Sequence, residues 1–198
     1  IKKPLICTDP GLVQLGMLDQ LRNLISNEFT PIIFDQTPAN PTQEAVEKAL
    51  EIYNAEGCDG IVGFGGGSSM DLGKAVSILA THEGTLVDYS VNEGGVEKIG
   101  ETAPLLAIPT TSGTGSEVTP FATIWDHIEK KKYSLDGESI YPYSAFIDSE
   151  LTDGLPLEIT LSTGLDAINQ ASESIWNKRA SGFTIDLAIK ALKLGFSS

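Results

Sequence analysis

As far as about residue 153, short apolar runs alternate along the chain with stretches of helical spacing. An apolar run bounded by turn residues predicts a buried strand, and apolar residues about three or four apart predict a helix. Thr42 is expected to cap one such helix and Gly57 to end it. This alternation is typical of an α/β fold with a parallel sheet. The predicted strands are Leu5–Thr8, Pro31–Asp35, Gly60–Phe64, Leu105–Ile108 and Ser144–Ile147, and Phe121–Asp126 with Lys132–Leu135 predicts a β-hairpin.

The pattern changes after this point. Leu157–Trp176 and Phe183–Gly195 have helical spacing, and no strand-like run lies between them. We place a boundary near Leu155 and Pro156. The sequence therefore predicts an α/β domain over residues 1–154 and the first helices of an all-helical domain over residues 155–198.

Composition narrows the class of protein. The chain has 198 residues, of which 41% are hydrophobic and 20% charged, and its net charge is -14. Such an acidic chain repels nucleic acid and anionic membranes, so neither is an expected partner. Cys7 and Cys58 are too few for a disulfide framework. No apolar run approaches the roughly 18 residues of a membrane span, and no signal peptide precedes the first strand, so we expect a cytoplasmic protein.

A glycine-rich turn, Gly65–Ser69, follows the third predicted strand and precedes a helix. Glycine allows positive φ and a close approach of the backbone to a ligand, and a helix N-terminus attracts anions. The turn therefore predicts a phosphate site, most simply for the pyrophosphate of a dinucleotide. It lacks the G-x-G-x-x-G pattern and the acidic residue expected about 20 positions later, so an ordinary strand-to-helix turn is the alternative.

A second polar loop, Pro109–Glu117, follows the next strand. It is rich in hydroxyl side chains and glycine, which suit hydrogen bonds to ribose or phosphate oxygens. A solvent-exposed loop with helix caps is the alternative. Two such loops at the carboxyl ends of parallel strands favour a ligand crevice there.

A third feature lies on the first of the two late helices. Asp166, Gln170 and Glu173 share one face of that helix, and a carboxylate there could ligate a metal. A solvated helix face is the alternative. No residue shows a pattern that identifies it as catalytic.

Together these segments resemble the iron-containing (group III) alcohol dehydrogenase family. The resemblance rests on residues 65–71 with Lys74, on 108–119, on 147–148 and on 163–167. It implies a dinucleotide domain of the dehydroquinate synthase-like type followed by a helical domain. It also implies interconversion of a primary alcohol and its aldehyde with NAD(P) and a divalent metal, Fe or Zn, that assists hydride transfer.

The resemblance also implies roles for individual residues. Asp9 would meet the adenosine ribose, which favours NAD over NADP, and Asp71 would lie near the nicotinamide. Asp166 would be the first metal ligand. Gln170 stands where the family has a histidine, which weakens the metal site. The remaining cofactor contacts would be Gly66, Gly67, Ser68, Thr110, Thr111, Thr114 and Lys132.

The resemblance covers the N-terminal half of such a dehydrogenase, so the later histidine ligands are not expected in this chain. Segments 119–126, 130–135 and 173–177 are similar to members that reduce phosphonoacetaldehyde, and Lys130–Lys132 could attract its phosphonate. A solvated hairpin turn is the alternative for these lysines. Relatives often dimerise, so a homodimer is expected.

Two other functions stay open. A dehydroquinate synthase-like enzyme would share the architecture, NAD and a metal, although the loop at 110–117 and the segment 164–167 favour the alcohol dehydrogenases. A non-catalytic dinucleotide-binding fragment would bind cofactor without turnover.

Overall fold

A computed structural model describes residues 1–25 and 27–197 of the chain. It forms two compact units. The first contains Ile1–Thr110 and Ser116–Asp148, and the second contains Thr111–Gly115 and Ser149–Ser198. The boundary that the sequence predicts near residue 155 lies inside the second unit.

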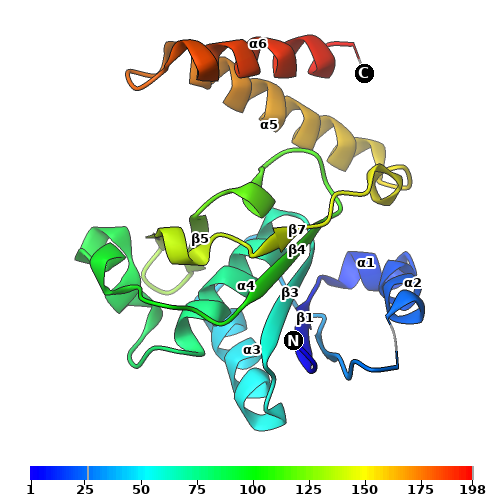
Figure 1. Cartoon of the computed structure of the whole chain (residues 1–198), viewed down its shortest axis with the longest axis vertical. Coiled ribbons are helices and arrows are strands. Elements are labelled where there is room, and N and C mark those ends of the chain that lie inside the picture. The colour runs from blue at the N-terminus through cyan, green and yellow to red at the C-terminus, as the bar shows by residue number, and fades with distance from the viewer. Residues whose placement is uncertain (26, 198) are drawn as a thin grey trace. The chain divides into compact units, whose positions relative to one another are not determined.

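The first unit is built on a five-stranded sheet in the order β2-β1-β3-β4-β7, in which every pairing is parallel (Figure 1). The α/β class with a parallel sheet is therefore confirmed. The predicted final strand is shorter than expected, since only two of its residues pair with β4. The strands are β1 (Pro4–Cys7), β2 (Ile32–Phe34), β3 (Gly60–Gly65), β4 (Leu105–Pro109) and β7 (Ser144–Ala145).

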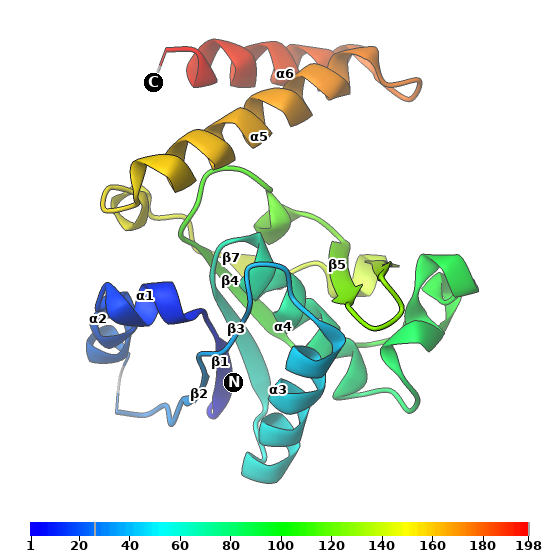
Figure 2. The ribbon, with the colours of Figure 1, turned by 180° about the vertical axis from the view of Figure 1, so that it is seen from behind.

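The order of the strands creates a switch point between β1 and β3. From β1 the chain moves outward to β2, then returns across β1 to β3 and continues to β4 on the other side. Right-handed crossovers then put the first helices on one face and the next two on the other, as Figures 1 and 2 show. The helices are α1 (Pro10–Gln14) and α2 (Met17–Leu24) on the first face, and α3 (Gln43–Glu56) and α4 (Gly67–Leu79) on the second.

Local signals set the ends of these helices. Thr42 caps α3, since its hydroxyl accepts a hydrogen bond of 3.2 Å from the Ala45 amide. Gly57 ends α3 with φ at +65°. Both confirm the prediction. Gly16, with φ at +72°, separates α1 from α2.

The hydrophobic core of this unit lies between the sheet and the pair α3 and α4. Adjacent strands contribute Leu5, Ile61 and Leu105 to one cluster, and Val46 of α3 and Leu72 of α4 pack into it. All five side chains are at most 3% exposed. The core therefore fixes the positions of the strand ends and of the first turn of α4.

The predicted hairpin forms a separate two-stranded sheet of β5 (Phe121–Asp126) and β6 (Lys131–Asp136). It packs on α4, and the Trp125 amide donates a hydrogen bond of 2.8 Å to the Pro41 carbonyl. The hairpin therefore lies beside the proline-rich loop that precedes α3.

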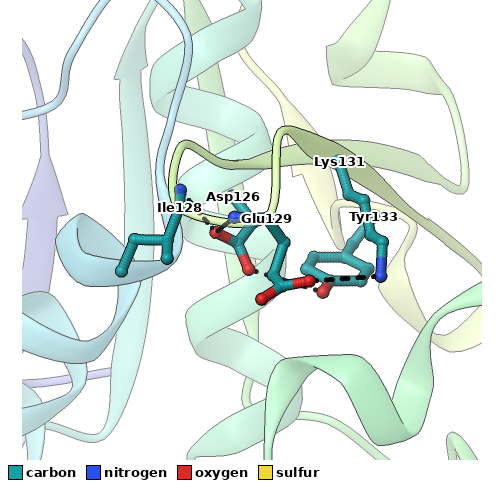
Figure 3. A network of polar contacts seen from close by, with 5 residues as sticks. All are labelled: Asp126, Ile128, Glu129, Lys131 and Tyr133. Atoms are coloured by element: carbon teal, nitrogen blue, oxygen red, sulfur yellow. Dashed lines mark hydrogen bonds and ion pairs between the residues drawn. The ribbon is translucent and has the colours of Figure 1, made fainter.

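The turn of the hairpin is held by its own polar contacts (Figure 3). Asp126 Oδ1 accepts hydrogen bonds of 2.9 Å from the amides of Ile128 and Glu129. Glu129 also forms an ion pair of 3.5 Å with Lys131. This explains why a turn with Lys130 at φ +51° is stable.

Short 3-10 turns complete the connections of the described chain: Leu86–Tyr89, Val91–Glu93, Val96–Lys98, Ser116–Val118, Glu138–Ile140 and Ser149–Thr152.

The second unit consists mainly of α5 (Leu157–Trp176) and α6 (Gly182–Gly195), which pack against each other. Both helices were predicted from spacing with nearly these bounds. Ser181 caps α6 by accepting a hydrogen bond from the Thr184 amide at 3.2 Å. Within the described residues, none of the helices is long and apolar enough to cross a membrane.

Candidate functional site

The glycine turn joins β3 to α4 at the switch point of the sheet. Gly65 has φ at +148°, and a β-carbon at this position would lie only 2.6 Å from Ser69 Oγ. Only glycine fits there without displacing Ser69. Gly66 has the extended values φ -75° and ψ -174° and caps α4. The positive φ that the sequence implied for this turn therefore belongs to Gly65 rather than Gly66.

The first turn of α4 offers backbone donors to an anion. The amides of Ser69 and Met70 donate to the Gly66 carbonyl at 3.1 and 3.3 Å, so the intrahelical ladder starts there. The amides of Gly67 and Ser68 precede this ladder, and helix geometry gives them no partner within the helix. These two groups, at the positive end of the helix dipole, fit a phosphate.

The Ser68 side chain contacts the proline-rich loop that precedes α3. Its hydroxyl donates a short hydrogen bond to the Ala39 carbonyl, in the proline-rich loop. A contact with phosphate at this position would therefore come mainly from the Ser68 amide. The same bond ties the glycine turn to residues 37–41.

Asp9 lies across the switch point, directly after β1. Its Oδ1 caps α1 by accepting hydrogen bonds of 2.9 and 3.2 Å from the amides of Gly11 and Leu12. Its Oδ2 lies 3.3 Å from the place where a β-carbon of Gly65 would be. The carboxylate and the glycine turn are thus neighbours, as a site for a ribose next to a phosphate requires.

Three buried hydroxyls lie near the ends of these elements, and the sequence analysis identified only Ser69 among them, as the last residue of the glycine turn. Thr8 follows β1, Thr37 follows β2, and Ser69 is in the first turn of α4. Each is at most 1% exposed, and among the described residues none of the three hydroxyls has a hydrogen-bond partner. Buried polar groups are normally paired, so this region fits a polar ligand or ordered water. Their sequence signal is a hydroxyl residue just past a buried strand.

The second polar loop starts beside the first. Thr110 is buried, and its amide donates a hydrogen bond of 3.0 Å to the Gly65 carbonyl. Thr111 is half-buried and Thr114 exposed, and both lie in the 111–115 segment, which belongs to the second unit. Their predicted contacts with a cofactor stay predictions.

Asp71 uses both carboxylate oxygens within the protein. Oδ1 accepts a hydrogen bond of 2.7 Å from the Ser116 hydroxyl, and Oδ2 accepts one of 2.9 Å from the Thr123 amide. Burial raises the pKa of Asp71, while these two hydrogen bonds and the nearby Lys74 act to lower it. Both carboxylate oxygens of Asp71 therefore have partners within the protein, and its predicted place near the nicotinamide stays a prediction.

Lys74 lies one turn further along α4 and is completely buried. Its Nζ donates to the carbonyl and hydroxyl oxygens of Ser116, at 2.7 and 2.8 Å, and to the Phe121 carbonyl at 2.7 Å. Burial lowers the pKa of Lys74 to about 8. The sequence analysis noted Lys74 only as part of a motif, because spacing cannot reveal partners so far along the chain.

Lys132 is exposed on β6. Its Nζ lies 4.2 Å from the centroid of the Trp125 ring, directly opposite in the hairpin. Such a cation–π contact orders a lysine at the surface. Its predicted contact with the nucleotide stays a prediction.

The two predicted metal ligands meet on α5. Gln170 Nε2 donates hydrogen bonds of 3.0 Å to Asp166 Oδ2 and 3.3 Å to the Gly113 carbonyl. Over residues 1–25 and 27–197, no group of three or more His, Cys, Asp or Glu side chains is placed to hold a metal ion. One carboxylate and one amide do not by themselves fit a resident metal, which needs about three protein ligands.

Comparison with known proteins finds relatives over nearly the whole chain. The chain is 44% identical, over 94% of its length, to a 4-hydroxybutyrate dehydrogenase of Cupriavidus necator. A solved 1,3-propanediol oxidoreductase matches 98% of the chain with a TM-score of 0.91 and 35% identity. A sulfoacetaldehyde reductase of Bifidobacterium kashiwanohense, solved in complex with NAD+, matches 98% with a TM-score of 0.88 and 30% identity.

The chain spans about half the length of each of these relatives, since it covers 50%, 50% and 51% of them. A family model described as iron-containing alcohol dehydrogenase matches residues 1–149, which is most of the chain. This match, together with the identities above, confirms the resemblance seen in the motifs: the chain belongs to the iron-containing alcohol dehydrogenase family.

Proposed function

We propose that this chain is the nucleotide-binding part of an enzyme that interconverts a primary alcohol and its aldehyde with NAD. The observation that carries the proposal is the glycine turn at the switch point, with the amides of Gly67 and Ser68, which have no partner within α4, on one side and Asp9 on the other. Ligands of open α/β sheets bind at such points, and a pyrophosphate suits a helix N-terminus.

Asp9 supports NAD over NADP. Its carboxylate can accept hydrogen bonds from the 2′-hydroxyl of the adenosine ribose, but it repels a 2′-phosphate. The repulsion between two like charges about 4 Å apart costs on the order of 1–4 kcal/mol, depending on the local dielectric. The relative solved with NAD+ is consistent with this choice.

The reaction is a hydride transfer. In the reducing direction, the nicotinamide gives a hydride to the aldehyde carbon, and the oxygen takes a proton to become the alcohol. The residues of this chain would bind and orient the dinucleotide: the amides of Gly67 and Ser68 at the pyrophosphate, Asp9 at the ribose, and Thr110 in the groove. Asp166 and Gln170 do not by themselves complete a metal site.

The substrate is proposed to be a short alcohol or aldehyde. The relatives act on 4-hydroxybutyrate, 1,3-propanediol and sulfoacetaldehyde by their names, so an aldehyde with an acidic group is a reasonable class, phosphonoacetaldehyde included. Lys131 is paired with Glu129 and Lys132 contacts Trp125, which leaves Lys130 as the first lysine to test for a phosphonate. A homodimer in the cytoplasm completes the proposal, and the two free cysteines suit a reducing compartment.

Two measurements test the proposed function. Titration with NADH, followed by its fluorescence, should show saturable binding. The longest natural chain that contains these residues should then oxidise NADH when given short aldehydes. Binding without turnover would favour the non-catalytic reading, and turnover of a sugar-phosphate substrate typical of dehydroquinate synthases would exclude the alcohol dehydrogenase reading.

A further inference from the structure

Lys74 is the least expected residue of the first unit. Its relative exposure is 0%, and lysine is almost never fully buried unless it is paired. The ammonium has three N–H donors, and three short hydrogen bonds use them: two to Ser116 and one to the Phe121 carbonyl. A fourth acceptor, Thr119 Oγ1, lies at 3.4 Å. All of these acceptors lie beyond the 111–115 segment in sequence.

Asp71 completes the arrangement from the same helix. The Ser116 hydroxyl accepts a hydrogen bond from Lys74 and donates one to Asp71. The Ser116 carbonyl accepts a second hydrogen bond from Lys74. Asp71 also accepts from the Thr123 amide in β5. One turn of α4 thus fixes both the 3-10 turn that starts at Ser116 and the first strand of the hairpin. We call Asp71, Lys74 and Ser116 the clamp.

The clamp fixes one end of the 111–115 segment, and the glycine turn fixes the other. Thr110, just before the segment, donates its amide to the Gly65 carbonyl, and Ser116, just after it, is held by α4. Both ends of this hydroxyl-rich segment are therefore attached to the same strand, turn and helix that form the proposed pyrophosphate site.

Stability alone does not account for the buried ammonium of Lys74. Taking a charged group out of water costs free energy even where hydrogen bonds compensate part of it, so a plain core would not need this residue. Hydrogen bonds to carbonyl and hydroxyl oxygens instead set the position and direction of the backbone that they hold. A backbone that contacts a cofactor must be accurately positioned, because small displacements of the contacting groups weaken binding.

We propose that Asp71 and Lys74 are positioning residues for cofactor binding, which act through Ser116 by fixing the backbone that directly follows the 111–115 segment. This inference rests on the proposed binding of NAD. It assigns a role to the fully buried Lys74 and to the half-buried Asp71.

The test compares substitutions of two buried serines, each made in the longest natural chain that contains them. Ser116→Ala removes the hydroxyl that links Lys74 to Asp71. Ser77→Ala is the matched control, since Ser77 is fully buried on the same helix and donates only to the Lys74 carbonyl, at 2.7 Å. We expect Ser116→Ala to raise the Kd for NADH and the KM for NAD about tenfold, with kcat at saturating NAD changed less than twofold. Ser77→Ala should leave the Kd for NADH and the KM for NAD within about twofold of wild type. It should lower Tm by about as much as Ser116→Ala does.

A second readout follows the segment itself. Hydrogen–deuterium exchange of amides 111–115 should be faster in Ser116→Ala than in Ser77→Ala. If wild type binds NADH and Ser116→Ala binds it equally well, the clamp has no positioning role, although the proposed function stands. If wild type binds no NADH, the proposed function is wrong and this inference falls with it.

Discussion

The Thr110 amide donates a hydrogen bond of 3.0 Å to the Gly65 carbonyl, at the point where two neighbouring parallel strands end. The two candidate loops, which are far apart in sequence, therefore begin at one place. This relationship follows from the register of β3 with β4, in which Gly65 pairs with Pro109. It gives a physical reason to test the glycine turn and its surroundings as one site.

Removing the charge of Asp9 should weaken the preference for NAD. Asp9→Asn keeps a good helix cap at α1 and removes the negative charge that repels a 2′-phosphate. We expect the ratio of the Kd values for NADPH and NADH to fall about tenfold, with little change in Tm. Titration of both cofactors by fluorescence measures this ratio. A wild-type protein that binds NADPH as tightly as NADH would contradict the assignment of Asp9.

A side chain at Gly66 should block the pyrophosphate. The φ of Gly66 is -75°, which valine tolerates, so the loss should come from occlusion of the helix N-terminus rather than from strain. We expect Gly66→Val to bind NADH at least about 100-fold more weakly while it keeps the far-UV circular dichroism of wild type. Gly182→Val, at the first turn of α6 where a β-carbon meets nothing within 4 Å, is the control. Normal binding by the folded Gly66→Val variant would place the phosphate elsewhere.

The burial of Lys74 should make stability depend on pH in the alkaline range. Its pKa is about 8 in the folded protein against 10.5 in the reference state. Between these values the unfolded chain holds a proton that the folded chain has released, so the free energy of unfolding should rise with pH, by at most about 1.4 kcal/mol per pH unit. Below pH 8 Lys74 is charged in both the folded and the unfolded chain, so the cost of burying its charge lowers the free energy of unfolding in full. The neighbouring charges of Asp71 and Glu117 oppose the shift and reduce this gain.

Urea unfolding at pH 7.5 to 10 measures this dependence. Lys74→Met should remove the rise, whereas Lys48→Met, at an exposed position of α3, should keep it. The same slope in wild type and Lys74→Met would show that Lys74 does not titrate in this range.

Residues 1–198 should not hold a metal tightly. Asp166 is one carboxylate and Gln170 is an amide, and a tight site of this kind needs about three protein ligands. We expect less than stoichiometric iron or zinc by mass spectrometry after dialysis. Gln170→His adds a strong ligand one turn from Asp166 and should tighten Zn²⁺ binding about tenfold or more, whereas Asp166→Ala/Gln170→His should not. Stoichiometric metal in the wild-type chain would show that other ligands have been missed.

The parts of the fold that the sequence predicted are those governed by local rules. The buried strands, the cap at Thr42 and the helix end at Gly57 depend on neighbouring residues, and the structure has them where expected. The break at Gly16 depends instead on positive φ at a single glycine, which the spacing of the surrounding apolar residues does not indicate.

The site was predicted less completely, because much of it depends on contacts over long sequence separations. The glycine turn and Asp9 could be placed, since each follows a recognisable strand. The partners of Asp71 and Lys74 lie more than 40 positions away, so no spacing rule indicates them. The bond of the Ser68 hydroxyl to the Ala39 carbonyl depends on how the loop before α3 folds back, so no spacing rule indicates it either.

The all-parallel sheet also determines how the chain can acquire its structure. Parallel partners require a crossover, so β1 pairs with β3 only after distant positions such as Pro4 and Gly60 meet, whereas Asp126 and Lys131 pair within one turn of the hairpin. Long-range pairing slows folding, while hairpins close in about 1–10 μs. Yet β1, the first of the five strands to be synthesised, lies between β2 and β3. The centre of the sheet can therefore assemble on the ribosome before β4 and β7 have emerged, and these strands add to an edge that already exists.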